Sequence, residues 1–287
     1  MRVFLTLILT SIPYLMNSQT VRKIVDSNSK FPVPFATIKF LNKPNGLIAS
    51  EKGEFDAAIE KSDSVLISSA GYYSSILTGD KIEAIIYLAP KIKTLTDIKI
   101  KSKRIVRSLL IGNNDQKFKD AFNWGPAYNG MKEEFAQKME LPDSSLTYRV
   151  KRILIPVSKI RCWGSFFIRV YSADSSGTLP GEELFMKSVS VNETNVRKKQ
   201  VEIGVSDSNL FIHESRLFFV SVSWPEEAYH NKCLTAIMVS KNSNQLTYVR
   251  RLTSKNYTWS QFETLKKPDG TSDQAATMFS VLVEELR

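Results

Sequence analysis

The chain has few of the side chains from which most enzyme sites are built. Only two of its 287 residues are histidine and two are cysteine, so a catalytic zinc site with several histidines is excluded. His213 begins a metalloprotease-like pattern but lacks the second histidine four places on. A Gly-x-Ser-x-Gly hydrolase turn and the glycine-rich phosphate loops are also missing. The sequence therefore predicts no metal and no cofactor.

Long apolar runs are absent except at the amino terminus. There Arg2 precedes an apolar run that continues through Ile12 and ends near Asn17, a pattern typical of a secretory signal peptide. The run is shorter than the roughly 20 residues of a membrane span. We predict a signal peptide over residues 1–18, with an uncleaved anchor as the alternative, and no transmembrane span after its removal. The mature protein is then periplasmic, on the outer-membrane surface, or secreted.

The formal charge of +10 does not by itself indicate a nucleic-acid partner. Basic residues are scattered among strand-like segments, as at Lys151-Arg152 and Arg250-Arg251, and an exported protein rarely meets DNA or RNA. Net charge governs solubility and non-specific association more than fold. We predict no nucleic-acid partner, and attraction to an anionic envelope surface remains the alternative to simple solubilisation.

The two cysteines, Cys162 and Cys233, both precede apolar strand-like runs. In an oxidising compartment an isolated pair can form a disulfide. Two buried free thiols are the alternative, and mass spectrometry without reductant distinguishes them.

Residues 19–101 carry the pattern of a small β-sandwich. Short β-branched segments bounded by turn residues, such as 21–25, 35–41 and 64–68, predict strands, and residues 98–100 are expected to close the module. Its core is predicted to contain the apolar side chains of these segments, namely Phe35, Ile38, Phe40, Phe55, Ile67 and Tyr72.

Three short motifs in this region carry a family resemblance. They are Pro34-Phe-Ala-Thr-Ile38, Gly53-Glu-Phe55 and Ser68-Ser-Ala-Gly-Tyr72. Their spacing resembles the carboxypeptidase-regulatory-like domain, a transthyretin-like sandwich found at the front of Gram-negative envelope proteins, including TonB-dependent receptors. The resemblance implies a fold and an envelope location. It implies no peptidase chemistry.

Residues 102–119 are basic and polar and are predicted to be a linker, followed by a second domain over residues 120–287. Strand patterns with turns every 8 to 12 residues or so predict a larger β-sandwich there. Residues 131–139 fit a helix or a strand, and the β context favours the strand. Within residues 167–171, alternation places Phe167, Arg169 and Tyr171 on one face. Residues 275–286 are expected to form one last strand.

The second domain resembles the jelly-roll-like regions that follow such modules in exported bacterial proteins, through residues 167–171, 174–181 and 218–224. The predicted fold class is therefore all-β: a small transthyretin-like or immunoglobulin-like sandwich followed by a larger jelly-roll-like sandwich. Jelly rolls include many carbohydrate-binding modules, but a fold hosts many functions.

Aromatic residues at predicted turns and strand ends are the candidate ligand contacts, because an exposed ring can stack on a sugar or a peptide. They are Trp224, Tyr229, His230, Trp163 and Trp124, with Trp259 as a further ring. Trp224 ranks first, and Trp224→Ala is expected to weaken ligand binding without unfolding the protein. The alternative is that these rings seal the sandwich edges.

The sequence predicts a non-enzymatic exported protein with a binding or assembly role, whose partner is an envelope protein or a glycan. Two alternatives remain: a carbohydrate-binding accessory protein, and a glycan- or peptide-processing enzyme with an unrecognised carboxylate site. The adjacent pairs Glu182-Glu183, Glu226-Glu227 and Glu284-Glu285 are expected to point to opposite faces of strands, so none is predicted to be an acid/base couple.

Overall fold

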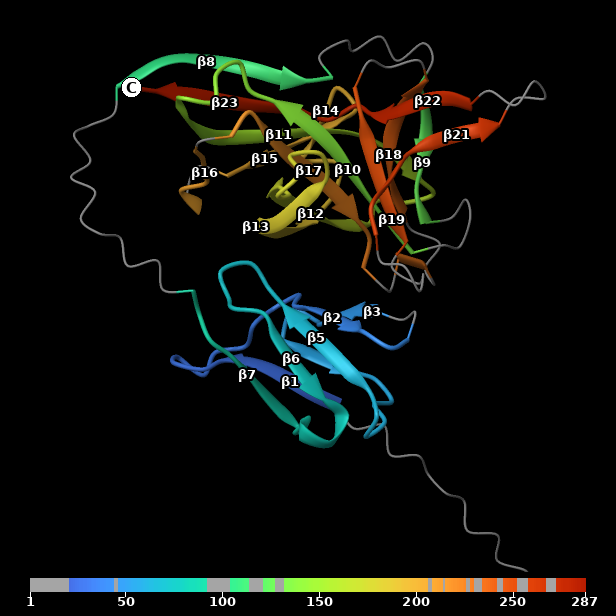
Figure 1. Ribbon diagram of the computed structural model, residues 1–287. Coiled ribbons are helices and arrows are strands. Elements are labelled where there is room, and N and C mark those ends of the chain that lie inside the picture. The colour runs from blue at the N-terminus through green and yellow to red at the C-terminus, as the bar shows by residue number, and fades with distance from the viewer. Residues whose placement is uncertain are drawn as a thin grey trace, which may run out of the picture.

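The computed structural model describes residues 21–43, 46–91, 104–113, 121–126, 132–205, 208–213, 215–225, 228–229, 234–241, 245–251, 258–266 and 272–287. Nearly all of its regular structure is β-strand, arranged as two sandwiches (Figure 1). The predicted all-β fold class is confirmed. The predicted signal peptide, residues 1–18, and the expected closing segment, residues 98–100, lie outside the described residues.

The first domain contains seven strands in two sheets. One sheet has the order β4-β1-β7 and the other the order β3-β2-β5-β6. The elements are β1 (Val21–Asp26), β2 (Thr37–Phe40), β3 (Gly46–Ile48), β4 (Glu54–Asp56), β5 (Ser64–Ser68), β6 (Ser75–Thr78), the 3-10 turn η1 (Gly79–Lys81) and β7 (Ile85–Leu88). The pairing of β1 with β7 is parallel.

Alternation along β2 and β5 separates the core of this domain from its outer face. Ile38, Phe40, Val65 and Ile67 are buried between the two sheets. Successive strand residues point to opposite faces, so the residues between them face outward. These outward residues are Thr37, Lys39, Leu66 and Ser68, and the register places Thr37 opposite Ser68 and Lys39 opposite Leu66.

Gly53 occupies a turn that requires glycine. Its φ is +71°, and a Cβ at this position would lie 2.5 Å from the carbonyl oxygen of Ile24. Only glycine takes this conformation at such close approach without strain. The turn delivers Phe55 into the core, where it is buried as predicted.

Phe35 does not belong to the core, contrary to the prediction. Its neighbour Ala36 is fully buried, whereas Phe35 is half-buried and has a φ of +56°, a region that bulky residues seldom adopt. Its ring lies 5.1 Å from that of Phe167 in the second domain. The chain places Ala36 inward, so Phe35 points out of the first sandwich and meets the second.

One layer of the second domain is a six-stranded sheet, whose order is β13-β12-β17-β10-β19-β20. Its members are β10 (Glu133–Glu140), β12 (Ser165–Ala173), β13 (Pro180–Ser190), β17 (Leu217–Ser223), β19 (Thr247–Arg251) and β20 (Ser260–Gln261). The ambiguous segment at residues 131–139 is therefore a strand, as the β context favoured.

A ten-stranded sheet forms the opposite layer. Its main path has the order β14-β15-β11-β18-β22-β21, with β16, β23, β8 and β9 joined to it. Its members are β8 (Ile105–Gly112), β9 (Ala121–Trp124), β11 (Thr147–Ile160), β14 (Val196–Arg197), β15 (Gln200–Gly204), β16 (Phe211–Ile212), β18 (Leu234–Lys241), β21 (Glu263–Lys266), β22 (Ser272–Thr277) and β23 (Ser280–Leu286). Consecutive strands such as β10 and β11 lie in different layers, the jelly-roll-like arrangement.

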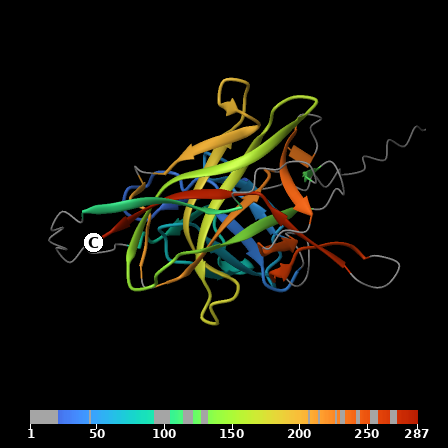
Figure 2. The same ribbon diagram turned by 90° about the horizontal axis from the view of Figure 1, so that it is seen from above.

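Two boundaries differ from the prediction. The expected linker at residues 102–119 contains β8, which pairs with β23 along its length (Figure 2), so this part of the chain belongs to the second domain. The expected single strand at residues 275–286 is two strands, β22 and β23. In both cases the partner strand is distant in sequence.

The core of the second domain lies between its two sheets. Phe135, Phe166 and Phe218 from one layer pack with Ile153 and Phe279 from the other. No helix in the described part of the chain is long and apolar enough to cross a membrane.

Candidate functional site

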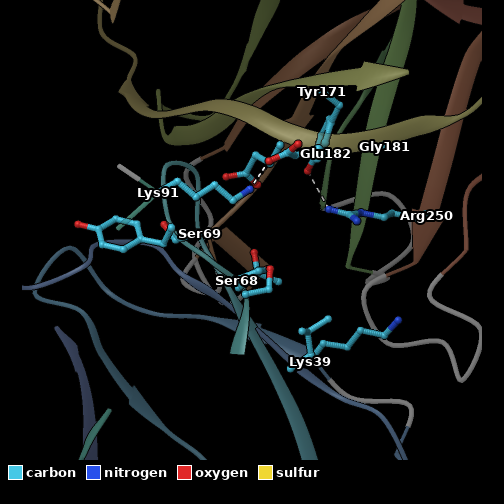
Figure 3. A pocket seen from close by; sticks show the side chains of 13 residues that line it. Lys39, Ser68, Ser69, Lys91, Tyr171, Gly181, Glu182 and Arg250 are labelled. Carbon is cyan, nitrogen blue, oxygen red and sulfur yellow. Dashed lines mark hydrogen bonds and ion pairs between the residues drawn. The ribbon is translucent and has the colours of Figure 1, made fainter. Parts of the chain in front are cut away.

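A polar cavity of about 280 Å³ lies where the two domains meet (Figure 3). Figure 1 shows the first domain, in blue to teal, against the side of the second that carries β12 and β13. Both domains line the cavity, with Thr37, Lys39, Leu66, Ser68, Ser69, Tyr72, Ser74 and Lys91 on one side and Tyr171, Gly181, Glu182, Glu183 and Arg250 on the other.

The outer face of the β2–β5 pair supplies the wall on the first domain. Thr37, Lys39, Leu66 and Ser68 are the outward residues of these two strands, and all four line the cavity. The alternation that buries Ile38 and its neighbours therefore also presents these side chains to the second domain.

Irregular pairing between β12 and β13 supplies the acidic part of the other wall. The register shifts between Val170 and Tyr171 and again between Tyr171 and Ala173, which are β-bulges that redirect side chains. Glu182 and Glu183 consequently both line the cavity. The prediction that this adjacent pair points to opposite faces is wrong, because strict alternation fails at the bulges.

Behind the cavity, the outer face of the six-stranded sheet carries a row of polar side chains. The register aligns Phe167, Ser223, Glu134 and Arg250 across four neighbouring strands. Arg169 and Ser221 form a pair in the next row. Glu134, Arg169, Ser221 and Ser223 are almost completely buried. Such groups are stable in the interior only when they are paired and hydrogen-bonded.

Glu134 is the centre of this network. Its Oε2 accepts hydrogen bonds from Nε and Nη2 of Arg250, at 2.8 and 2.6 Å. Its Oε1 accepts from the hydroxyl groups of Tyr171, at 2.9 Å, and Ser221, at 2.5 Å. Nη2 of Arg250 also donates to the Tyr171 hydroxyl oxygen at 2.8 Å. Removing one member of a buried ion pair typically costs about 3–5 kcal/mol, so this network fixes Arg250 firmly.

Arg169 lies deeper than Arg250 and is less well satisfied. Its Nη1 donates to the Ser223 hydroxyl at 2.6 Å and lies 3.8 Å from Glu134 Oε1. Its Nε lies 3.2 Å from Glu183 Oε2, an ion-pair distance, but makes no hydrogen bond among the described residues. Arg169 thus links the buried Glu134 to Glu183 at the cavity wall.

The charges in this network perturb one another. Burial would raise the pKa of Glu134, but the positive charges of Arg250 and Arg169 outweigh burial and lower it. Burial raises the pKa of Glu183 above its ordinary value, and Arg169 only partly opposes this effect. Burial also raises the pKa of Tyr171 well above its usual range. Tyr171 is therefore a neutral donor and acceptor, and Glu134 is ionised at neutral pH.

Two contacts join the domains around the cavity. Lys91 forms an ion pair with Glu182, which Figure 3 shows as a dashed line. The Phe35 and Phe167 rings form the apolar contact. Polar and apolar contacts therefore hold both walls of the cavity in place.

Trp224, the first choice among the predicted ligand contacts, is only 2% exposed. Its Nε1 donates to the Thr235 carbonyl at 2.7 Å, and its ring packs on Phe135 in the core. Trp224 is thus not an exposed ring, and because removal of a buried tryptophan leaves a cavity in the core, Trp224→Ala is now expected to destabilise the fold. The ring is inside because Trp224 continues the inward-facing positions of β17, which hold Val220 and Val222.

The other predicted aromatics also lie away from the cavity. Trp124, Trp163 and Tyr229 are partly buried against the second core. Tyr229 accepts a hydrogen bond from the Glu133 N–H, and Trp124 packs edge-on against Phe135. Thus Trp124, Trp224 and Tyr229 gather at one end of the sandwich as packing residues, the alternative considered for them. His230 lies outside the described residues.

Trp259 lies close to the polar network. The guanidinium of Arg250 is 4.6 Å from its ring centroid, within the range of a cation–π contact. Tyr171 packs against the same ring. Trp259 therefore supports Arg250 from behind and does not line the cavity.

Cys162 is disulfide-bonded in the structure. Cys233, the only other cysteine in the sequence, lies outside the described residues.

Sequence reasoning missed Glu134, Arg250 and the role of Lys39. One signal was available: alternation already placed Phe167, Arg169 and Tyr171 on one face, and an arginine between two aromatic residues needs a partner when that face is covered. The identity of that partner depends on the register of β12, β17 and β10, which come from segments far apart in the chain.

Comparison of the sequence with protein-family models found no match, and comparison with curated proteins found no similar sequence. Within the described residues no group of three or more His, Cys, Asp or Glu side chains is placed to hold a metal ion. The assignment of a function therefore depends on the cavity and its residues.

Proposed function

We propose that this protein is an exported, non-enzymatic binding protein of the bacterial envelope, and that the cavity between its two domains holds the ligand. The signal-peptide pattern of residues 1–18 and the resemblance of three motifs in residues 19–101 to the carboxypeptidase-regulatory-like domain support the envelope location. The observation that carries the binding role is the cavity itself. Its walls come from both domains, and polar side chains from both walls line the same space. Ligand sites commonly form at domain interfaces.

The proposal assigns each domain a part in binding. The first domain supplies hydroxyl groups and Lys39 from the outer face of β2 and β5. The second supplies Arg250, Glu182 and Glu183 on a sheet whose side chains are held by a buried network. Preorganised groups lose little freedom on binding, which favours recognition of a small polar ligand.

The enzymatic alternative draws support from one observation, the raised pKa of Glu183 at the cavity wall. Perturbed carboxyl groups in clefts are often catalytic acids. However, Glu134 does not line the cavity, Glu182 forms an ion pair with Lys91, and Glu183 forms one with Arg169. These carboxylates are committed to structural pairs, so we favour binding over catalysis.

Blocking the cavity tests the proposed function. We expect Ser69→Trp, which fills the cavity from the first domain, to abolish the binding of small ligands. The measurement is saturation-transfer NMR with a panel of monosaccharides, uronic acids and dicarboxylic acids against the full mature chain. Ser62→Trp, at an exposed position of the same domain, is the matched control and should bind like the wild type. No ligand bound by the wild type, or equal binding by both variants, contradicts the proposal.

A further inference from the structure

Two cations from different domains face the same cavity. Lys39 extends from β2 of the first domain and Arg250 from β19 of the second, and both line the cavity. Figure 3 shows the Lys39 side chain extending to the side of the cavity on which Arg250 lies. Burial and the positive charge of Arg250 lower the pKa of Lys39. Like charges brought together in this way favour a negatively charged group nearby.

Arg250 is held in a fixed position for such a contact. Its guanidinium is hydrogen-bonded to Glu134 and Tyr171 and lies over the Trp259 ring. A planar guanidinium that is already oriented loses little freedom when it binds an oxyanion. Tyr171 shares the cavity wall with Arg250, whereas Glu134 and Trp259 do not line the cavity, and Arg250 itself contributes to the cavity surface.

Each acidic residue of the site is paired with a cation. Glu182 pairs with Lys91, Glu183 with Arg169, and Glu134 with Arg250. Among the described residues of the cavity and of the network behind it, there are four cations and three carboxylates, namely Lys39, Lys91, Arg169 and Arg250 against Glu134, Glu182 and Glu183. These described residues therefore carry one net positive charge when all of them are ionised.

Neutral donors complete the first-domain wall. Thr37, Ser68, Ser69 and Ser74 line the cavity beside Lys39, and each hydroxyl can donate to or accept from a ligand oxygen. The volume of about 280 Å³ is near the lower end of small-molecule sites, which span roughly 300–1,000 Å³. A single sugar ring or a short organic acid suits this size, and a polymer segment of several units does not.

We infer that the cavity binds the oxyanion group of a small organic ligand, a carboxylate or a phosphate, between Lys39 of the first domain and Arg250 of the second. This inference rests on the proposed function and adds the charge class of the ligand. A ligand bound in this way bridges the two domains, because its anionic group contacts both.

Charge-matched ligands test the inference. We expect D-glucuronate to bind the full mature chain in isothermal titration calorimetry, and D-glucose, its neutral counterpart, to bind at least about tenfold more weakly, since a hydrogen bond between charged groups is markedly stronger than a neutral one. Inorganic phosphate serves as the second anion. If phosphate competes with D-glucuronate, the site accepts both carboxylates and phosphates. If D-glucuronate binds and phosphate does not compete with it, the site is specific for carboxylates.

Matched variants locate the interaction. Lys39→Gln is expected to weaken glucuronate binding about tenfold or more. Lys23→Gln removes the same charge from the other sheet of the first domain and should leave affinity unchanged within about twofold, because a charge change far from the site is screened by salt. Circular dichroism checks that both variants are folded. We expect Lys39→Gln to fold because Lys39 lies on the outer face of its sheet.

The outcomes separate this inference from the proposed function. Equal affinity for glucose and glucuronate, no binding of either anion, or an unaffected Lys39→Gln variant overturns the anion site. If Ser69→Trp still abolishes the binding of neutral ligands in that case, the cavity remains the binding site and only the charge assignment fails. If Ser69→Trp leaves all binding intact, both proposals fail.

Discussion

At the scale of single residues, this protein places unusual charge inside a β-sandwich. Arg169 and Glu134 are about 1% exposed, and neither could be buried alone without a large desolvation cost. Each is tolerated because four strands bring its partners into register. Trp224 is the opposite case: the sequence predicted an exposed ligand contact, but its position on the strand places the ring in the core.

Glu183 provides the prediction at this scale. Its folded-state pKa is raised by burial, so the folded protein retains this proton to higher pH than the unfolded chain does. The free energy of unfolding should therefore fall as pH rises from the ordinary carboxyl pKa through the raised one. Glu183→Gln removes this dependence and should raise the urea midpoint at pH 7.5, with a gain that shrinks towards pH 4.

Urea denaturation of the wild type and Glu183→Gln across this pH range checks the expectation. The same difference between the two proteins at every pH would contradict it. A variant less stable than the wild type only at high pH would mean that the ion pair with Arg169 outweighs burial.

At the scale of elements, strand register governs both the fold and the site. The β-bulges between β12 and β13 bring two adjacent glutamates to one cavity. On β2 and β5, unbroken alternation gives a buried apolar face and a polar outer face. The strand β8, whose sequence is IVRSLLIG, shows that an apolar segment within a basic and polar region forms a strand when a distant partner is available, since β23 provides it.

Two neighbouring leucines test the position of β8. Leu109 packs against the second core, whereas Leu110 is 46% exposed. We expect Leu109→Ala to lower the free energy of unfolding by about 1–2 kcal/mol, the lower range for a partly buried leucine. Leu110→Ala is the matched control and should change it by less than about 0.5 kcal/mol. Equal effects in urea denaturation would place residues 105–112 outside the second sandwich.

At the scale of the whole molecule, the main feature is the interface between the two domains. It combines an ion pair between Lys91 and Glu182 with an aromatic contact between Phe35 and Phe167, around one cavity. The positive φ of Phe35 is a local cost, and strained residues persist where surrounding contacts hold them. Here the contact is with Phe167.

A double-mutant cycle on Phe35 and Phe167 measures whether this contact operates in solution. The rings are 5.1 Å apart and tilted by 55°, and such pairs typically couple by about 0.5–1.5 kcal/mol. We expect a coupling energy in this range from urea denaturation of Phe35→Ala, Phe167→Ala and the double variant. The pair Phe31 and Phe167 is the control, because Phe31 is 73% exposed, and should be additive. Additivity for Phe35 as well would mean that the domains do not dock in this way.

The sequence by itself determined the fold class and much of the local structure. Period-two alternation with regular turns was enough to predict two β-sandwiches and the burial of Ile38, Phe40, Phe55 and Ile67. The β context favoured a strand for the ambiguous residues 131–139, where β10 lies. These features depend on near neighbours in the chain, because a strand buries every second residue whichever strand it pairs with.

Only the tertiary structure decided where the polar groups meet. Glu134 and Arg250 become a pair through the register of β10 and β19, Glu182 and Glu183 share a wall through β-bulges, and Lys39 approaches Arg250 through docking of the domains. Two of these relations join segments far apart in the chain, and the third depends on register shifts between neighbouring strands, so none follows from the alternation pattern alone. The candidate site therefore emerged from the tertiary structure, at residues that the aromatic pattern did not indicate.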